Sequence, residues 1–204
     1  MGQRRFCATC TDSIIMTNRI DIRTYLFKGD EKLFLDTNIW YYIYGPKPIT
    51  PSPEDVIYRN LYSKAFKKIQ ENKCSIYTDA LIISEFVNAF ARNMWERHNK
   101  NLPEKNKIKY KEYRKTPDFK HRVITIISET KKIFKDSTKC NSDFESMDFN
   151  LFFIEYEKGH LDLNDIIYGD LCEIKGFTLV TNDKDFKGHS IPILTANNKL
   201  LGVC

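Results

Sequence analysis

The 204-residue sequence has no long apolar segment. A membrane-spanning helix needs roughly 18 or more apolar residues in a row, and no part of the chain approaches that length. The N-terminal residues include Arg4 and Arg5, but no apolar region of the kind found in secretory signals follows them. We therefore expect a cytoplasmic protein with no membrane partner.

Cysteine, glycine and histidine are scarce as well. Six cysteines are too few and too scattered for a disulfide framework, and no second pair joins Cys7 and Cys10 to complete a zinc site. No glycine-rich Walker sequence is present, which excludes a P-loop nucleotide hydrolase. The four histidines lie outside paired motifs and no nucleophile elbow is present, so a serine or cysteine hydrolase has little support.

The composition that remains is that of a folded protein with unevenly placed charge. Apolar residues make up 42% of the chain and aromatic residues 13%, which excludes a disordered chain. The net charge is +5. Between Arg92 and Arg122, eleven basic and four acidic residues give +7, which leaves −2 for all the rest. The sequence therefore predicts a near-neutral domain that carries one basic segment.

Short apolar segments alternate with helical patterns along the chain. Such alternation predicts an α/β fold with three α/β/α layers around a central, mostly parallel sheet. We expect an N-terminal extension over residues 1–30 and a single domain over 31–204, with a basic helical insertion around 99–159. The expected strands are 32–35, 74–78, 177–181 and 191–194, and the expected helices are 53–71, 79–98, 123–134 and 162–176. Residues 136–150 are expected to form a polar loop.

Acidic residues recur where parallel strands would end, the edge at which such sheets bind ligands. Asp36 and Asp183 follow predicted strands, Glu85 lies beside the apolar face of a helix, and Asp165 falls in a first helical turn, three residues after Asp162. Each acid alone is explained by a turn, a solvated surface or a helix cap. Together, four carboxylates at one edge would repel one another unless cations hold them, and oxygen ligands suit Mg²⁺ or Mn²⁺. Two such ions can hydrolyse a phosphodiester bond.

Four segments resemble the motifs of PIN-domain nucleases: Leu33–Asn38, Ser84–Glu85, Leu163–Asp165 and Thr178–Phe186. The resemblance implies metal-dependent endonucleolytic cleavage of RNA that leaves 3′-hydroxyl and 5′-phosphate ends. It assigns catalysis and metal binding to four acidic residues, the quartet. It places one further acid near the second metal, and it implies that three polar side chains support these acids. The quartet is Asp36, Glu85, Asp165 and Asp183, the further acid is Asp185, and the supporters are Asn38, Thr181 and Asp162.

The resemblance extends to the VapC-type toxins of type II toxin–antitoxin pairs, which implies a small antitoxin partner and a homodimer as further expectations. The chain departs from these small toxins in its N-terminal extension and in its longer middle, residues 99–159. A ribonuclease that acts without an antitoxin is the alternative.

The basic segment is a candidate nucleic-acid interface. Tyr110, Tyr113 and Phe119 lie among its basic residues, as stacking on single-stranded bases would require. Acids at the catalytic edge repel phosphates, so the chemistry needs cationic side chains nearby. A solvated charged segment is the alternative. We predict that RNA, single-stranded or in structured loops, contacts Arg92, Lys107, Lys109, Lys111, Arg114 and Lys115.

Two other functions compete with the nuclease interpretation. A phosphatase of the haloacid-dehalogenase type also carries an aspartate after its first strand, but it needs another aspartate where this chain has Asn38. The second alternative is a PIN-like nucleic-acid-binding protein without significant catalysis, since the sequence does not report how tightly metals bind.

Overall fold

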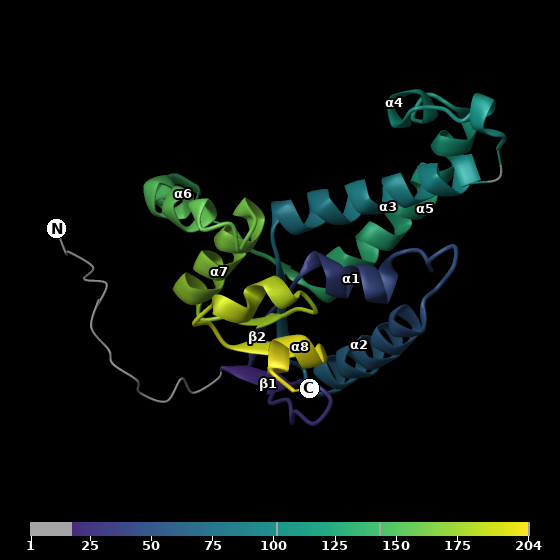
Figure 1. Cartoon of the computed structure of the whole chain (residues 1–204). Helices are drawn as coiled ribbons and strands as arrows, with labels where there is room; N and C mark the ends of the chain where they lie inside the picture. The colour runs from purple at the N-terminus through teal and green to yellow at the C-terminus, as the bar shows by residue number, and fades with distance from the viewer. Residues whose placement is uncertain (1–17, 101, 143, 204) are drawn as a thin grey trace.

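A computed structural model describes residues 18–203, apart from 101 and 143, so the pair Cys7 and Cys10 lies outside the described residues. Six strands form one sheet at the centre of the molecule, in the order β1-β6-β5-β2-β3-β4 (Figure 1). Every neighbouring pair is parallel. The strands are β1 (Arg19–Asp21), β2 (Lys32–Leu35), β3 (Ser75–Thr78), β4 (Thr138–Lys139), β5 (Thr178–Val180) and β6 (Ile193–Thr195).

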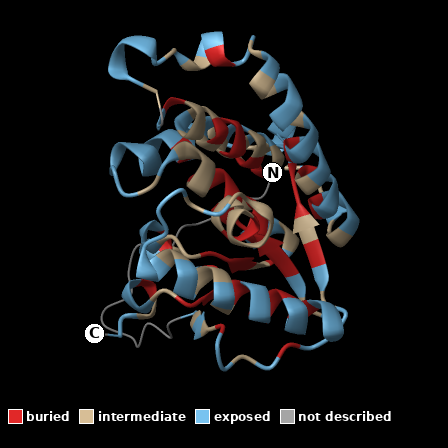
Figure 2. Cartoon of the chain, turned by 90° about the vertical axis from the view of Figure 1, so that its right-hand side faces the viewer, coloured by how far each residue is buried: buried red, intermediate tan, exposed pale blue. Residues whose placement is uncertain are grey.

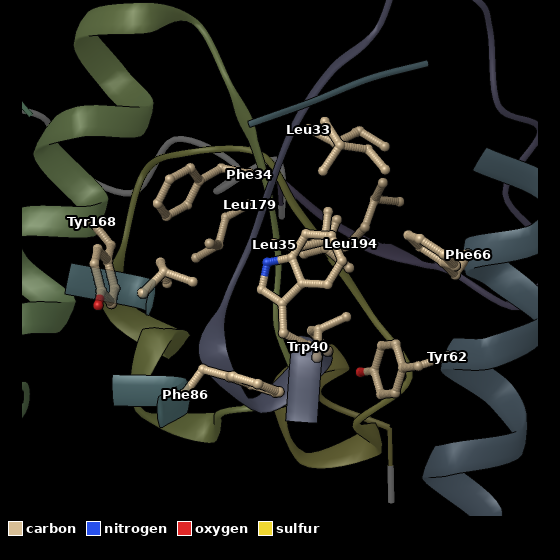
Figure 3. Packing of buried hydrophobic residues seen from close by; sticks show 14 of the residues in the cluster. Leu33, Phe34, Leu35, Trp40, Tyr62, Phe66, Phe86, Tyr168, Leu179 and Leu194 are labelled. Atoms are coloured by element: carbon tan, nitrogen blue, oxygen red, sulfur yellow. The ribbon is translucent and has the colours of Figure 1, made fainter. Parts of the chain in front are cut away.

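The strand β2 lies in the middle of the sheet, between β5 and β3. Its apolar run is buried on both faces, as expected for a central parallel strand. Successive side chains point to opposite faces of a strand. Phe34 packs against the ring of Tyr168, with 5.6 Å between ring centroids, while Leu33 and Trp40 lie on the other side (Figure 3). The core therefore has two layers, one on each face of the sheet.

Helices cover both faces, which confirms the predicted three-layer α/β/α fold. Right-handed crossovers place the helices between β2 and β4 on one face and those between β4 and β5 on the other. No helix in the described part of the chain is both long and apolar enough to cross a membrane. The helices are α1 (Thr37–Tyr44), α2 (Pro53–Glu71), α3 (Ala80–Lys100), η1 (Glu104–Asn106), α4 (Tyr110–Tyr113), α5 (Pro117–Asp136), η2 (Phe144–Ser146), α6 (Phe149–Glu157), α7 (Leu163–Lys175), η3 (Lys184–Gly188) and α8 (Asn198–Leu201).

Several helix ends follow directly from the sequence. The Ser52 side chain accepts the backbone N–H of Asp55, and the Asp55 carboxylate accepts the backbone N–H of Ser52, so a capping box begins α2. Asp162 caps α7 in the same way through the backbone N–H of Asp165, at 2.9 Å. Gly176 ends α7 at a φ of 66°, a left-handed conformation that glycine adopts readily.

The middle of the chain contains more regular structure than its composition suggests. The charged segment after α3 folds into η1 and α4, and α5 then returns to the sheet. Much of this segment is exposed (Figure 2). Residues 136–150, expected to be a polar loop, include β4, which pairs with β3. That expectation is wrong at Thr138 and Lys139 because strand pairing uses backbone groups, which polar residues also carry.

The sheet begins earlier than the sequence suggested. β1 pairs with β6, and Ile22 and Phe27 after it are buried in the core. The predicted extension over residues 1–30 therefore contains part of the domain, at least from Arg19 onward. Three residues of mixed polarity are too short a pattern to identify as a strand from the sequence.

Arg19 connects this first strand to η3. Its guanidinium donates hydrogen bonds to the backbone carbonyls of Phe186 (3.3 Å), Lys187 and His189 (3.0 Å). We expect Arg19→Ala to lower the free energy of unfolding by about 1–3 kcal/mol, because it leaves these carbonyls without their donor. Chemical denaturation measures the change.

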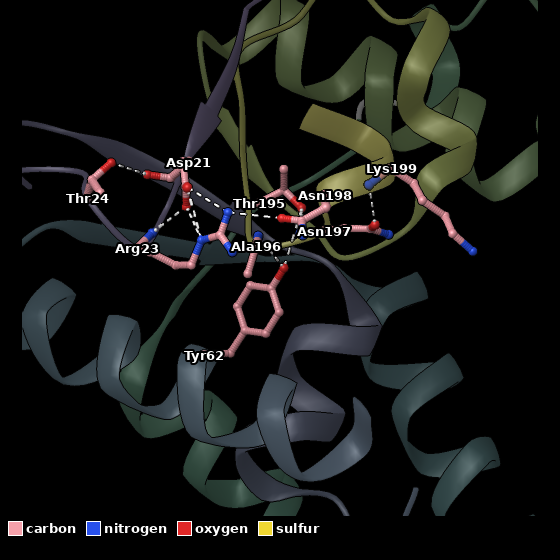
Figure 4. A network of polar contacts seen from close by, with 9 residues as sticks. All are labelled: Asp21, Arg23, Thr24, Tyr62, Thr195, Ala196, Asn197, Asn198 and Lys199. Carbon is pink, nitrogen blue, oxygen red and sulfur yellow. Dashed lines mark hydrogen bonds and ion pairs between the residues drawn. The ribbon is translucent and has the colours of Figure 1, made fainter. Parts of the chain in front are cut away.

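Arg23 is the matched control for Arg19. It lies just after the same strand, where it pairs with Asp21 at 2.7 Å and donates to Asn198 at 3.0 Å (Figure 4). Because the pair is partly exposed, we expect Arg23→Ala to change stability by about 1 kcal/mol or less. Equal decreases in the free energy of unfolding of the two variants would show that the hydrogen bonds of Arg19 stabilise the fold no more than a partly exposed ion pair does.

Candidate active site

Acidic residues gather at the edge of the sheet where β2 and β5 end. Asp36 directly follows β2, and Asp183 follows β5 by three residues. Because the two strands are parallel neighbours, both aspartates lie at the same edge. A pocket of about 660 Å³ opens there. It is lined by Asp36, Thr37, Asn38, Tyr41, Tyr42, Asp55, Glu85, Asn88, Ala89, Arg92, Asp162, Asp165, Tyr168 and Asp183.

Asp36 is held by two polar side chains. Its Oδ2 accepts hydrogen bonds from the Asn38 amide at 2.5 Å and from the Thr181 hydroxyl at 2.6 Å. The same hydroxyl oxygen accepts the backbone N–H of Asp183 at 3.0 Å. Thr181 therefore fixes the loop of Asp183 relative to the carboxylate of Asp36, although it does not itself line the pocket.

Glu85 approaches the pocket from α3 and is held from two other helices. The Thr37 hydroxyl of α1 donates to Oε2 at 2.5 Å, and the Asn164 amide of α7 donates to Oε1. Both carboxylate oxygens therefore have a donor, and the side chain is directed inward. Neither Thr37 nor Asn164 was assigned a role from the sequence, because residues far apart in the chain gave no sign that they meet Glu85.

The remaining predicted acids divide into two groups. Asp165, Asp183 and the helix cap Asp162 line the pocket. Asp185 does not line the pocket, and its exposed side chain lies in the first turn of η3. The pocket thus contains the complete predicted quartet, while Asp185 stands apart from it.

Burial and mutual repulsion raise the pKa values of two of these carboxyls. Burial raises the pKa of Asp36 to about 7, against the opposing effect of the Thr181 hydrogen bond, and the charges of Glu85 and Asp183 contribute. The pKa of Asp165 rises to about 8, because of burial first and then the charge of Asp162. In the absence of cations, these carboxyls therefore hold protons near neutral pH.

The donor set fits a hard divalent cation. Carboxylate oxygens are the ligands that Mg²⁺ and Mn²⁺ prefer, and a cation would relieve the repulsion that raises these pKa values. Within the described residues, no three acidic, histidine or cysteine side chains are grouped closely enough to enclose an ion. Mg²⁺ commonly uses one or two carboxylates and completes its coordination with water and substrate oxygens, so a loose carboxylate arrangement suits it.

Asp79 is a further buried acid, and its position in the sequence was not assigned a role. It directly follows β3, is 5% exposed, and its Oδ1 accepts the backbone N–H of Ile82 at 2.9 Å. Its Oδ2 is buried without a partner in the described structure, and burial raises its pKa. It does not line the pocket. The signal that identified Asp36, an acid just after an apolar strand, applies equally to Asp79.

A buried tyrosine organises the loops that follow β5 and β6. The Tyr62 hydroxyl accepts the backbone N–H of Ala196 at 2.9 Å, and it lies 3.0 Å from Oδ1 of Asn182 (Figure 4 shows Tyr62 and Ala196). The backbone N–H of Asn182 in turn donates to Oδ1 of Asn38 at 3.2 Å. Tyr62 belongs to α2, so this helix supports the loops after β5 and β6, next to the pocket.

The residues predicted to bind nucleic acid lie in two regions of the structure. Arg92 lines the pocket. The others lie outside the pocket, in and around η1 and α4, and all are exposed: Lys107, Lys109, Lys111, Arg114 and Lys115.

The comparisons with known proteins agree with this geometry. No curated protein matches the chain. The sequence profile of the PIN domain matches residues 33–191, a range that contains all four quartet residues and begins after β1. PIN domains are typically nucleases and generally use divalent metals. Because the match spans most of the chain and the fold has the expected layers, this protein belongs to the PIN-domain family.

Proposed function

We propose that the protein is a Mg²⁺- or Mn²⁺-dependent endoribonuclease. The main support for this proposal is that the four carboxylates of the quartet line one open pocket. They come from the end of β2, from α3, from α7 and from the loop after β5. A cluster of acids with raised pKa values has little structural value of its own, because it costs repulsion and desolvation. Divalent cations and a phosphodiester substrate explain why such a cluster is kept.

Each acidic residue of the predicted site has a proposed role in metal binding or catalysis. Asp36, Glu85 and Asp165 would hold the principal cation together with water and substrate oxygens, and Asp183 would complete a second site or orient the attacking water. Asp185 lies close to Asp183 in the chain and would act from outside the pocket. The chemistry that divalent cations would supply at these residues is a lowered pKa of a nearby water and stabilisation of the leaving oxygen. Attack on phosphorus with departure of the 3′-oxygen leaves 3′-hydroxyl and 5′-phosphate ends.

The substrate in this proposal is RNA that is single-stranded or exposed in loops. The pocket is open and is lined by six acids, including the quartet, so cationic side chains must compensate the repulsion of phosphates. The residues proposed for this role are Arg92, Lys107, Lys109, Lys111, Arg114 and Lys115, all of them exposed.

A role as the toxin of a type II pair extends the proposal. It requires a small antitoxin partner, a homodimer and a cytoplasmic site of action. Growth arrest on expression, relieved by the product of an adjacent small reading frame, would support it. If cells continue to grow while they express an active nuclease, the toxin role is contradicted, and the alternative of a ribonuclease that acts without an antitoxin is supported.

Cleavage assays test the central proposal. We expect the purified protein to cut single-stranded RNA internally with Mg²⁺ or Mn²⁺ and to stop when the ions are chelated, because the carboxylates alone cannot activate water. End analysis of the products checks the position of the phosphate. Cleavage that survives chelation contradicts the mechanism. Binding without cleavage on every RNA supports a PIN-like binding protein.

A further inference from the structure

Arg92 connects the acidic pocket to α4. It is the basic residue among those that line the pocket, and its guanidinium lies over the ring of Tyr110, 5.6 Å from the ring centroid. Tyr110 begins α4, which packs beside α3 (Figure 1). Arg92 follows Glu85 by seven residues on α3, which corresponds to about 10 Å along the helix axis. The pocket and α4 therefore form one continuous surface.

The segment before α4 is fixed to α3 rather than loosely attached. The Trp95 indole N–H donates to the Ile108 carbonyl at 2.8 Å. The buried Asn99 side chain donates to the same carbonyl at 2.9 Å and accepts the Ile108 backbone N–H at 3.1 Å. Tyr113 in α4 is completely buried, and its hydroxyl donates to Asp118 at 2.9 Å. A surface held in this way loses little conformational entropy when a ligand binds.

Some basic side chains of this region form ion pairs with acids, and others do not. Lys107 pairs with Glu104 at 2.6 Å, and Lys115 pairs with Glu112 at 3.1 Å. Among the described residues, no ion pair includes Arg92, Lys109 or Lys111. Lys109 and Lys111, which flank Tyr110 in the chain, therefore remain available beside Arg92, and the same ion pairs also leave out Lys105, Arg114 and Lys120.

We infer that Arg92, Lys109, Tyr110 and Lys111 form a subsite for single-stranded RNA about three nucleotides from the scissile phosphate. The inference rests on the proposed nuclease function. Stacked nucleotides are spaced about 3.4 Å apart along one strand, so the distance of about 10 Å between Glu85 and Arg92 spans about three of them. An aromatic ring beside a guanidinium offers a stacking surface, and two lysines beside it meet the phosphates. Paired bases in a duplex cannot reach such a surface.

Binding of labelled RNA to the full chain tests the subsite, in chelator so that no cleavage occurs. We expect Arg92→Ala and the double variant Lys109→Ala/Lys111→Ala each to bind a single-stranded 12-mer about tenfold more weakly. The logarithmic slope of affinity against salt should become shallower by about 0.7 for each phosphate that a variant no longer binds.

Lys68→Ala is the charge-matched control, since Lys68 is exposed near the end of α2. It should bind the 12-mer as the wild type does. Unchanged affinity of the subsite variants for the 12-mer would overturn the inference, and so would wild-type binding of a blunt duplex that is as strong as binding of the 12-mer.

A parallel cleavage assay with Mn²⁺ separates this inference from the function on which it rests. Cleavage by the wild type together with unchanged binding by the variants overturns the subsite alone. No cleavage, with binding that still depends on Arg92 and the two lysines, overturns the nuclease proposal and keeps the subsite as an RNA-binding surface. Melting temperatures of all variants identify any decrease in binding caused by misfolding, and the exposed Lys109 and Lys111 provide the test if Arg92→Ala fails to fold.

Discussion

An Asp36→Asn variant is expected to fold normally and to cut RNA at least about a thousandfold more slowly than the wild type. Asn has nearly the same shape and keeps one oxygen to accept the hydrogen bonds of Thr181 and Asn38. It removes the negative charge that a divalent cation needs, and metal stabilisation of the transition state is worth several kcal/mol, which corresponds to such a factor. Initial rates at saturating Mn²⁺ measure it.

The stability of the same variant gives an independent check. Asp36 is buried near other acids, so removing its charge relieves repulsion, and the metal-free variant should melt no lower than the metal-free wild type. Asp30→Asn is the matched control, because Asp30 is exposed just before β2, at the opposite edge of the sheet. It should cleave at the wild-type rate. Undiminished cleavage by Asp36→Asn would remove this residue from the mechanism.

Without divalent cations, the protein is expected to lose stability as the pH rises from about 5 to about 9. The pKa values of Asp36 and Asp165 are about 7 and about 8 in the folded chain, whereas an unfolded aspartate has a pKa near 3.9. Between these values the folded state binds more protons than the unfolded state, so the free energy of unfolding falls with rising pH. The decrease is complete above the folded pKa values. A decrease in melting temperature on the order of 10–20 °C is expected.

Metal addition should reverse this decrease. Cations bind the deprotonated carboxylates, so Mn²⁺ should raise the melting temperature at pH 8–9 more than at pH 5. The double variant Asp36→Asn/Asp165→Asn serves as the control, since it should show a flatter pH dependence and a smaller response to Mn²⁺. Equal slopes in the wild type and the double variant would assign the pH effect to other groups.

The sequence predicted much of the fold because its signals are local. A buried central strand appears as an apolar run such as Leu33–Leu35, and helix ends appear as Ser52 with Pro53 or as Gly176. β1 and β4 were missed because they are short and contain polar residues, whereas the equally short β5 and β6 lie in apolar segments. The pairing of β1 with β6 joins segments that are far apart in the chain, and no local pattern encodes it.

The acids of the candidate site also include some whose positions the sequence predicted and one whose position it did not. The order of Asp36, Glu85, Asp165 and Asp183 relative to strands and helices was sufficient to predict their common edge, because parallel strands all end on one side. The separation of Asp185 from the pocket depends on how η3 turns after Asp183, which the residue types do not specify.

The basic segment illustrates what depends on the tertiary structure alone. The count of charges identified the segment and its central basic residues, but it did not show which of them pair with acids. Packing separates them, because Trp95 and Asn99 bind Ile108 and place Tyr110 against Arg92, while Lys107 and Lys115 pair with neighbouring acids. Residue types and their order thus determine the chemistry available to the chain. Contacts between distant residues decide which side chains meet, since these contacts depend on the path of the whole chain through space.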